Sequence, residues 1–220
     1  PDGGAGKQRR RPASSVDVGG VTFPGVAGET ETKLRRRLAE AAVAFERDRF
    51  GEAYRLLQSI DRLAPDVPEV LEVRGLTQYR QGRWAQAIKD LRRFEELSDS
   101  VEQHPVIADC HRARREWAAV AETWRELGEA SPSAELVEEG RIVMAGAYAD
   151  QGDLKAAIRL LESAPTVPRK LKPHHLRRFY ALADLYERAG DRKRARRLFE
   201  SIDATEPGLG DVRDRIRQLR

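Results

Sequence analysis

The sequence predicts an all-α fold of repeated helical hairpins, because one pattern of small, turn and aromatic residues recurs along the chain. Residues 75–94 read GLTQYRQGRWAQAIKDLRRF and carry that pattern in full. Its small residue, turn glycine, aromatic and second small residue are Gly75, Gly82, Trp84 and Ala87. Small residues let two helices approach closely, and a glycine supplies the turn between them.

The pattern recurs at a period of about 34 residues. Ala53 lies 34 residues before Ala87, and Trp117 lies 33 residues after Trp84. Matching residues in the other copies are Phe50, Ala53 and Leu57; Trp117, Val120 and Trp124; Gly152, Ala157 and Leu161; and Gly190, Ala195 and Phe199. Prolines follow the expected second helices at Pro65, Pro132 and Pro207. A generic bundle of amphipathic helices would also be helical, but it would not keep this period.

These residues resemble the tetratricopeptide repeat (TPR), a helix–turn–helix unit. The resemblance implies a right-handed α-solenoid of about five TPR-like repeats, plus a C-terminal capping helix, with the first helices lining a concave peptide-binding groove. We expect a repeat domain over residues 29–209, with repeats at approximately 33–66, 67–100, 101–132, 133–165 and 173–207. Arginine outnumbers lysine and asparagine is absent, so the chain also resembles small uncharacterised TPR proteins of GC-rich, actinobacterial-type bacteria.

The two ends of the chain differ from the repeats. Residues 1–28 are rich in glycine and proline, contain the basic run Lys7–Arg11 and show no helical period, which predicts a disordered tail. The alternative is that Phe23, which precedes Pro24, belongs to an extended docking peptide. At the other end, residues 210–220 predict a capping helix, whose apolar side would cover the last repeat.

The helices follow from apolar spacing and from helix-end signals. Leu34 and Leu38 begin an apolar stripe in a first helix that starts near Glu29. Pro68 suits the first turn of a later helix, and Ser131 before Pro132 suggests an N-cap. The remaining helices are expected at about 50–63, 68–81, 84–97, 104–115, 117–129, up to 150, 153–163, 174–189 and 192–204.

Composition limits the possible functions. The chain of 220 residues carries a net charge of +4, and residues 166–220 hold 15 Lys/Arg against 8 Asp/Glu, a net +7. It has no apolar run of the length of a membrane span. The single cysteine, Cys110, fits a reducing compartment, so we expect a cytoplasmic location. The sequence begins at Pro1, which leaves a signal peptide further upstream open.

No catalytic or cofactor motif stands out, so we expect neither an enzyme nor a cofactor. His104 and the pair Cys110–His111 are close in sequence, but no second pair stands at ligand spacing, so we expect no metal. Glutamates and aspartates have basic neighbours at helical spacing, which indicates solvated ion pairs rather than paired catalytic acids. One TPR subclass clamps a C-terminal carboxylate with groove asparagines, and this chain has none.

We therefore predict a non-catalytic scaffold or adaptor that binds a protein or peptide, with its oligomeric state undetermined. The resemblance places nine residues in the groove: Leu76, Tyr79, Arg80, Asp109, Arg112, Ile142, Ala149, Tyr180 and Asp184. Apolar residues beside arginines favour a peptide with an apolar anchor and an acidic group; the other interpretation places Leu76 and Tyr79 in the core. The alternative function is a nucleic-acid- or ribosome-associated protein that uses the tail and a basic patch, Arg192, Lys193, Arg194, Arg196 and Arg197.

Overall fold

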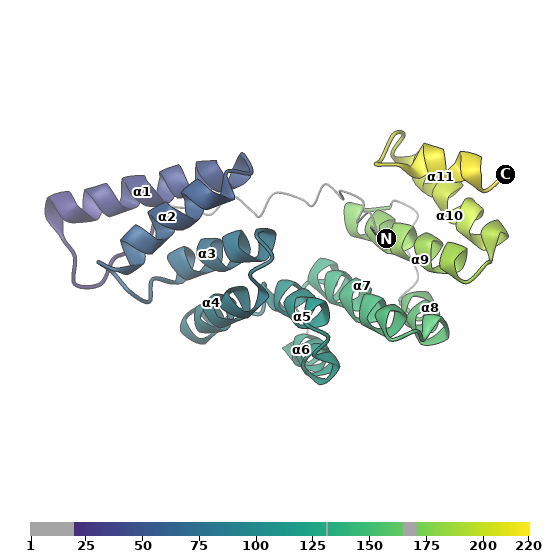
Figure 1. Ribbon diagram of the computed structural model, residues 1–220, viewed down its shortest axis with the longest axis horizontal. Helices are drawn as coiled ribbons and strands as arrows, with labels where there is room; N and C mark the ends of the chain where they lie inside the picture. Colours follow the sequence, from purple (N-terminus) through teal and green to yellow (C-terminus); the bar gives the residue numbers. More distant parts are fainter. Residues whose placement is uncertain (1–19, 131, 165–170) are drawn as a thin grey trace. The chain divides into compact units, whose positions relative to one another are not determined.

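The computed structural model describes residues 20–130, 132–164 and 171–220, and every regular element within these ranges is a helix. The helices are α1 (Gly28–Glu46), α2 (Phe50–Asp61), α3 (Pro68–Arg80), α4 (Trp84–Ser98), α5 (His104–Ala113), α6 (Trp117–Ala130), α7 (Ala134–Asp150), α8 (Leu154–Glu162), α9 (Pro173–Arg188), α10 (Arg192–Thr205) and α11 (Val212–Gln218). Successive helices form antiparallel hairpins (Figure 1). The helix bounds match the predicted ones closely.

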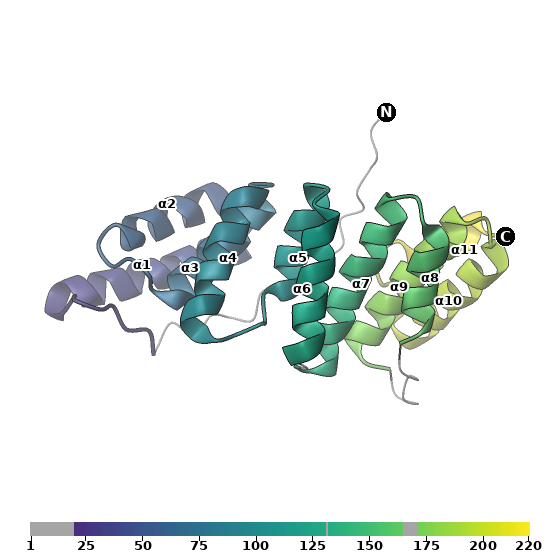
Figure 2. The ribbon, with the colours of Figure 1, turned by 90° about the horizontal axis from the view of Figure 1, so that it is seen from below.

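The described chain forms two compact units, residues 20–123 and residues 124–220, and the division falls within α6. In the first unit α1 packs on α2, α2 on α3, and α3 on α4, as Figure 2 shows from a second direction. In the second unit α7 packs on α8 and on α9, and α10 lies between α9 and α11. No helix in the described ranges is long and apolar enough to cross a membrane.

The turns inside the hairpins follow the glycine pattern. Gly82, Gly152 and Gly190 have φ angles of +72°, +88° and +82°, a backbone conformation that glycine adopts without a steric penalty. The first and third hairpins lack the glycine, and there Asp48 and Arg115 adopt φ angles of +58° and +60°. The sequence prediction of a glycine-centred turn is therefore confirmed at the three glycines.

Close helix contact explains the small residue at Gly75. A Cβ atom added there would lie 2.6 Å from the Cδ2 and Cγ atoms of Leu91 and 3.4 Å from the carbonyl oxygen of Ala87. Gly140 on α7 has a similar role, because its added Cβ would lie 2.4 Å from Leu127. Both glycines therefore allow a distance between helices that any larger residue would increase.

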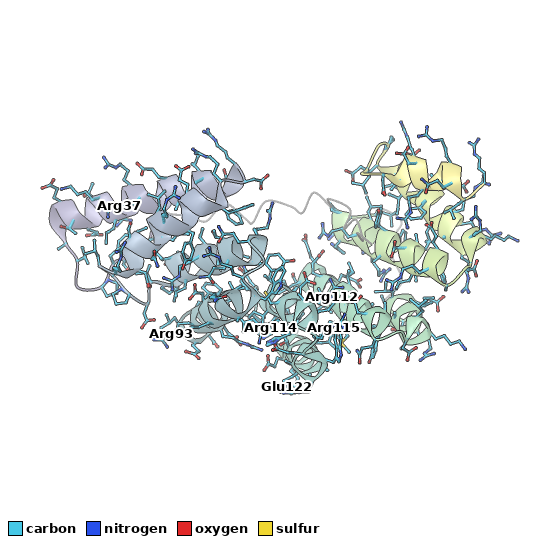
Figure 3. All side chains as sticks on the ribbon, in the orientation of Figure 1. Arg37, Arg93, Arg112, Arg114, Arg115 and Glu122 are labelled. Carbon is cyan, nitrogen blue, oxygen red and sulfur yellow. The ribbon has the colours of Figure 1, made fainter. Side chains whose placement is uncertain are left out.

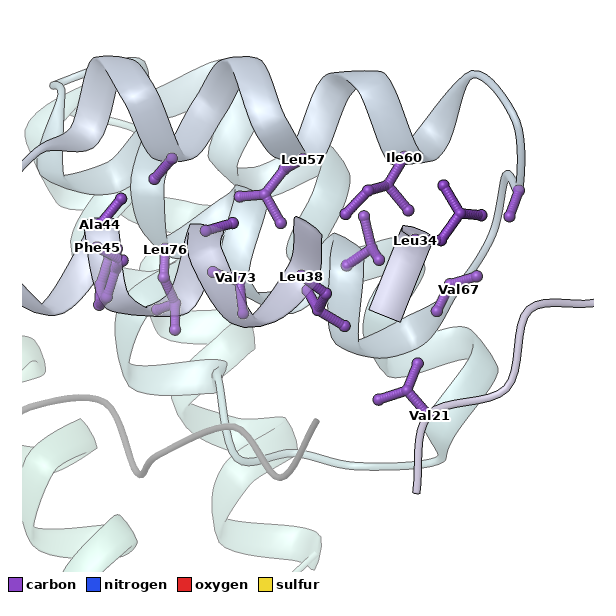
Figure 4. Packing of buried hydrophobic residues seen from close by; sticks show 14 of the residues in the cluster. Val21, Leu34, Leu38, Ala44, Phe45, Leu57, Ile60, Val67, Val73 and Leu76 are labelled. Carbon is purple, nitrogen blue, oxygen red and sulfur yellow. The ribbon is translucent and has the colours of Figure 1, made fainter. Parts of the chain in front are cut away.

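The prediction of a disordered tail up to residue 28 is wrong for its last part. Val21 and Phe23 are only 1% and 3% exposed and join the core of the first unit. Figure 4 shows Val21 beside Leu34 and Val67. A turn holds the segment, since the Val26 N–H donates to the Phe23 carbonyl at 3.0 Å. Burial of two large apolar side chains offsets the entropy of ordering this short segment. Residues 1–19, with the basic run, lie outside the described residues.

The structure differs from the sequence prediction at the start of α7 and agrees with it at α11. Ser133, rather than Ser131, is the N-cap of α7, because its side chain accepts a hydrogen bond from the Leu136 N–H at 3.3 Å. Pro132 separates the two serines, and Ser131 itself lies outside the described residues. At the end of the chain α11 forms where it was predicted, with Val212 and Leu219 buried and Ile216 partly buried.

Candidate functional site

The first helices of adjacent hairpins are joined by polar side chains. In the first unit the Tyr79 hydroxyl on α3 donates to Oδ2 of Asp109 on α5 at 2.5 Å. Asp109 also accepts from Nε of Arg112 at 2.9 Å, one helical turn away. The Tyr79 ring lies edge-on to Trp84 with ring centres 5.5 Å apart. Tyr79 is thus held by both its ring and its hydroxyl, in a half-buried position.

Arg80 lies next to Tyr79 and connects α3 to the preceding hairpin. Its guanidinium pairs with Asp48 at 2.8 Å and lies over the Phe50 ring, 4.6 Å from the ring centre. The side chain remains 38% exposed. We call Tyr79, Arg80, Asp109 and Arg112 the α3–α5 surface. Arg112 is labelled in Figure 3, among the side chains of the same unit.

Two of the predicted groove residues belong to the core instead. Leu76 is 8% exposed and belongs to the same apolar cluster as Phe45 and Val73. Ala149 is 5% exposed in the cluster of the second unit, against which Ile142 packs half-buried. Leu76 and Ala149 are therefore corrections to the predicted site, since their side chains have too little accessible area to contact a partner. The second interpretation, that Leu76 is a core residue, fits its burial.

Tyr180 repeats in the second unit the geometry of Tyr79. Its hydroxyl donates to Oδ1 of Asp211 at 2.6 Å, and its ring lies edge-on to Phe199 at 5.6 Å. Burial, together with the hydrogen bond to Asp211, raises the pKa of the Tyr180 hydroxyl. The tyrosine-to-aspartate spacing is 31 residues here and 30 in the first unit. The capping segment therefore contacts α9 in the way that α5 contacts α3.

Asp184 is also used by the capping helix. Nη2 of Arg215 on α11 donates to Oδ1 of Asp184 at 2.8 Å, and Nε of Arg215 donates to Glu187 at 2.9 Å. The same guanidinium lies over Phe199, 5.2 Å from the ring centre. The structure thus brings Tyr180 and Asp184 together, and each pairs with a residue in or next to α11.

Other polar pairs also join the first helices of adjacent hairpins, and sequence reasoning missed them. Nε2 of Gln103, the residue before α5, donates to Glu72 on α3 at 2.7 Å, and burial raises the pKa of that glutamate. In the second unit Arg178 on α9 pairs with Glu138 on α7 at 3.2 Å, and both are buried. Polar residues spaced by about one repeat were the available signal, and the tyrosine–aspartate pair carries it most clearly.

The predicted basic patch divides into two groups on α10. Arg194 turns toward acids: it donates to Asp191 at 2.5 Å, lies 3.3 Å from Glu162, and covers the Tyr186 ring at 4.3 Å. The remaining four cations, Arg192, Lys193, Arg196 and Arg197, line one surface hollow together with the end of the chain. Arg194 is therefore not part of the cationic surface that the other four make.

The sequence similarity to a known protein family lies within the repeats. Residues 179–213 and residues 139–163 each match a family profile described as tetratricopeptide repeat. No curated protein sequence matches the chain. These two matches lie in the second unit only, and the structural likeness to solved proteins covers up to 84% of the chain.

Three solved TPR structures resemble the fold. A thermophilic TPR protein of Thermus thermophilus is 17% identical, with a TM-score of 0.64 over 84% of this chain and 98% of that one. A TPR protein of Parabacteroides merdae is 16% identical, with a TM-score of 0.64 over 84% and 70%. The C-terminal part of a TPR protein of Cytophaga hutchinsonii is 11% identical, with a TM-score of 0.60 over 83% and 69%.

At such identities the structural likeness concerns the fold alone. The chain has the α-solenoid fold of TPR repeats, as predicted, and the profile matches together with these neighbours support the TPR family. Nothing in the comparisons supports the nucleic-acid alternative.

Proposed function

We propose that this protein is a non-catalytic scaffold that binds a protein or peptide on the α3–α5 surface. TPR folds typically act as interaction scaffolds, which suggests the class of function. The observation that carries the proposal is the Tyr79–Asp109–Arg112 chain of hydrogen bonds, which holds polar and aromatic side chains of two adjacent first helices in fixed positions. Such preorganisation lowers the entropic cost of binding.

The chemistry of the α3–α5 surface favours a peptide with an apolar anchor and an acidic group. Arg80 and Arg112 lie on either side of Tyr79 on the α3–α5 surface. Tyrosine and arginine are among the residues most often found at binding hot spots. Asp48 and Asp109 already pair with the two arginines, so an acidic group on the ligand must compete with them. Because of this competition, the proposal favours a peptide whose apolar anchor contributes as much binding free energy as its acidic group.

Charge reversal tests the proposal. Affinity capture with the full chain would be compared among the unmodified protein, Arg80→Glu, and Arg55→Glu as the matched control. Arg55 is exposed on α2, a second helix. Partners of the α3–α5 surface should be retained by the unmodified protein and by Arg55→Glu. In Arg80→Glu they should bind more weakly by about 1–3 kcal/mol.

Two results would contradict the proposal. In the first, a folded Arg80→Glu protein captures the same partners in the same amounts. In the second, Arg55→Glu loses them equally. Far-ultraviolet circular dichroism on all three proteins separates lost binding from lost folding.

A further inference from the structure

A cationic hollow lies at the edge of the second unit, between α10 and the end of α11. Its volume is about 460 Å³. The face of α10 contributes four cations, Arg192, Lys193, Arg196 and Arg197, with Glu200 one turn further on. Leu219 and Arg220 complete the lining. The four cations share a face because residues four apart in a helix lie one above the other.

The charge of this hollow is largely uncompensated. Arg196 donates to Glu200 at 2.8 Å, and Arg192 donates to the Gln218 carbonyl at 2.6 Å. The side chains of Lys193, Arg197 and Arg220 form no hydrogen bond or ion pair with the residues that the structure describes, and Lys193 interacts with the Asp191 carboxylate only through space. Five cationic side chains and one carboxylate side chain therefore line a single hollow, which gives these side chains a net charge of +4. Like charges held this close repel one another and attract anions to the site.

The residues that line the hollow also indicate which kind of anion fits it. The lining contains no aromatic side chain on which a nucleic-acid base could stack. Its one aliphatic side chain, Leu219, is 5% exposed and belongs to the core of the second unit, so the charged side chains are the ones that a ligand can contact. Glu200 lies among the cations and would repel a continuous phosphate backbone, whereas spaced carboxylates can avoid it. The missing aromatic side chain and the position of Glu200 favour an acidic peptide over RNA or DNA.

We propose that this hollow binds an acidic peptide segment, with its carboxylates against Lys193, Arg197 and Arg220. The site lies on a second helix and the capping helix, so it is separate from the α3–α5 surface. It goes beyond the proposed function, because one scaffold would then hold two ligands at two surfaces.

Direct binding to the full chain tests this site. The probe is a fluorescein-labelled peptide of glutamates spaced by glycines, without an apolar side chain, and its binding is followed by fluorescence anisotropy at low and moderate salt. The test variant is Lys193→Glu/Arg197→Glu. The matched control is Lys155→Glu/Arg159→Glu on α8, which changes the same two residue types at the same spacing on exposed positions.

We expect the test variant to bind the probe about tenfold or more weakly than the unmodified protein, since two ion pairs are lost and two repulsions gained. The control variant should bind nearly as the unmodified protein does, and binding should weaken with added salt. The probe lacks the apolar anchor that the α3–α5 surface is proposed to require, so weaker binding in Arg80→Glu but not in the test variant would place the probe at that surface and overturn the assignment to the hollow. Failure at the hollow is therefore distinguishable from failure at the α3–α5 surface.

Three results would overturn the proposal. Equal weakening in test and control variants would mean attraction to the overall charge rather than to this hollow. Displacement of the probe by a single-stranded RNA of equal charge, at a lower concentration than unlabelled peptide requires, would mean a nucleic-acid site. Displacement by millimolar inorganic phosphate would mean a site for small anions only.

Discussion

Replacing Gly75 by alanine measures how closely α3 and α4 must approach. In an exposed helix this change would stabilise the protein by up to about 1 kcal/mol, because alanine has the higher helix propensity. Here the added Cβ would lie 2.6 Å from two carbon atoms of Leu91, well inside the contact distance of carbon atoms. Leu91 is fully buried, so it has little room to move.

Overpacking of this kind costs about 1–3 kcal/mol and outweighs the gain in propensity. We therefore expect Gly75→Ala to lower the free energy of unfolding by roughly 1–2 kcal/mol. That corresponds to a fall in unfolding temperature of a few degrees for a chain of this size, about 2–4 °C per kcal/mol. Urea and thermal unfolding of the full chain, followed by circular dichroism, measure both quantities.

Gly128→Ala is the matched control. Gly128 lies inside α6, is exposed, and an added Cβ there would meet nothing within 4 Å. We expect this change to stabilise the protein by about 0.5–1 kcal/mol. The two glycine-to-alanine changes should thus have opposite signs.

A double-mutant cycle with Leu91→Ala isolates the contact. Leu91→Ala alone should cost about 2–5 kcal/mol by leaving a cavity. In that background Gly75→Ala should become stabilising, because the overlapping atoms are gone. If Gly75→Ala stabilises the unmodified protein as much as Gly128→Ala does, the reasoning about close helix approach is refuted.

Three further predictions concern the ends of the chain and one turn. Phe23→Ala should cost about 3 kcal/mol of stability, against under about 0.5 kcal/mol for the exposed neighbour in Thr22→Ala, as measured by urea unfolding; equal effects would contradict the packing of this segment. Removal of Asp211–Arg220 should lower the melting temperature and promote self-association, because it uncovers the apolar side of α10; a monomeric elution profile with unchanged melting would argue against a capping role. Hydrogen bonds from Arg114 and His111 hold the pKa of Glu116 at about 2, below its ordinary value of 4.5. Its contribution to stability is therefore present above pH 4.5 and lost as the pH falls toward 2, so Glu116→Gln should reduce stability slightly at neutral pH and flatten the loss in acid; parallel pH profiles for the two proteins would exclude this.

Local physics made much of the fold predictable from the sequence. Glycine at Gly82, Gly152 and Gly190 marks backbone positions of positive φ, and the 3.6-residue period marks the buried face of each helix. Both signals lie within a few residues of the feature they predict. Helix bounds, turns and the need for a small residue at Gly75 were therefore readable before any packing was known.

The tertiary structure decided which of the singled-out side chains remain available. Tyr79 and Tyr180 look alike in the sequence, and each is half-buried with a hydrogen bond to an aspartate 30 or 31 residues away, which is Asp109 on α5 for the first and Asp211, just before α11, for the second. Leu76 and Phe23 are apolar residues whose burial depends on helices elsewhere in the chain. Of the cations on α10, Arg194 pairs with Glu162 on α8 and with the N-cap Asp191, whereas Arg197 pairs with no acid among the described residues. Such pairings arise from distances between side chains that are remote in sequence, which periodicity alone does not encode.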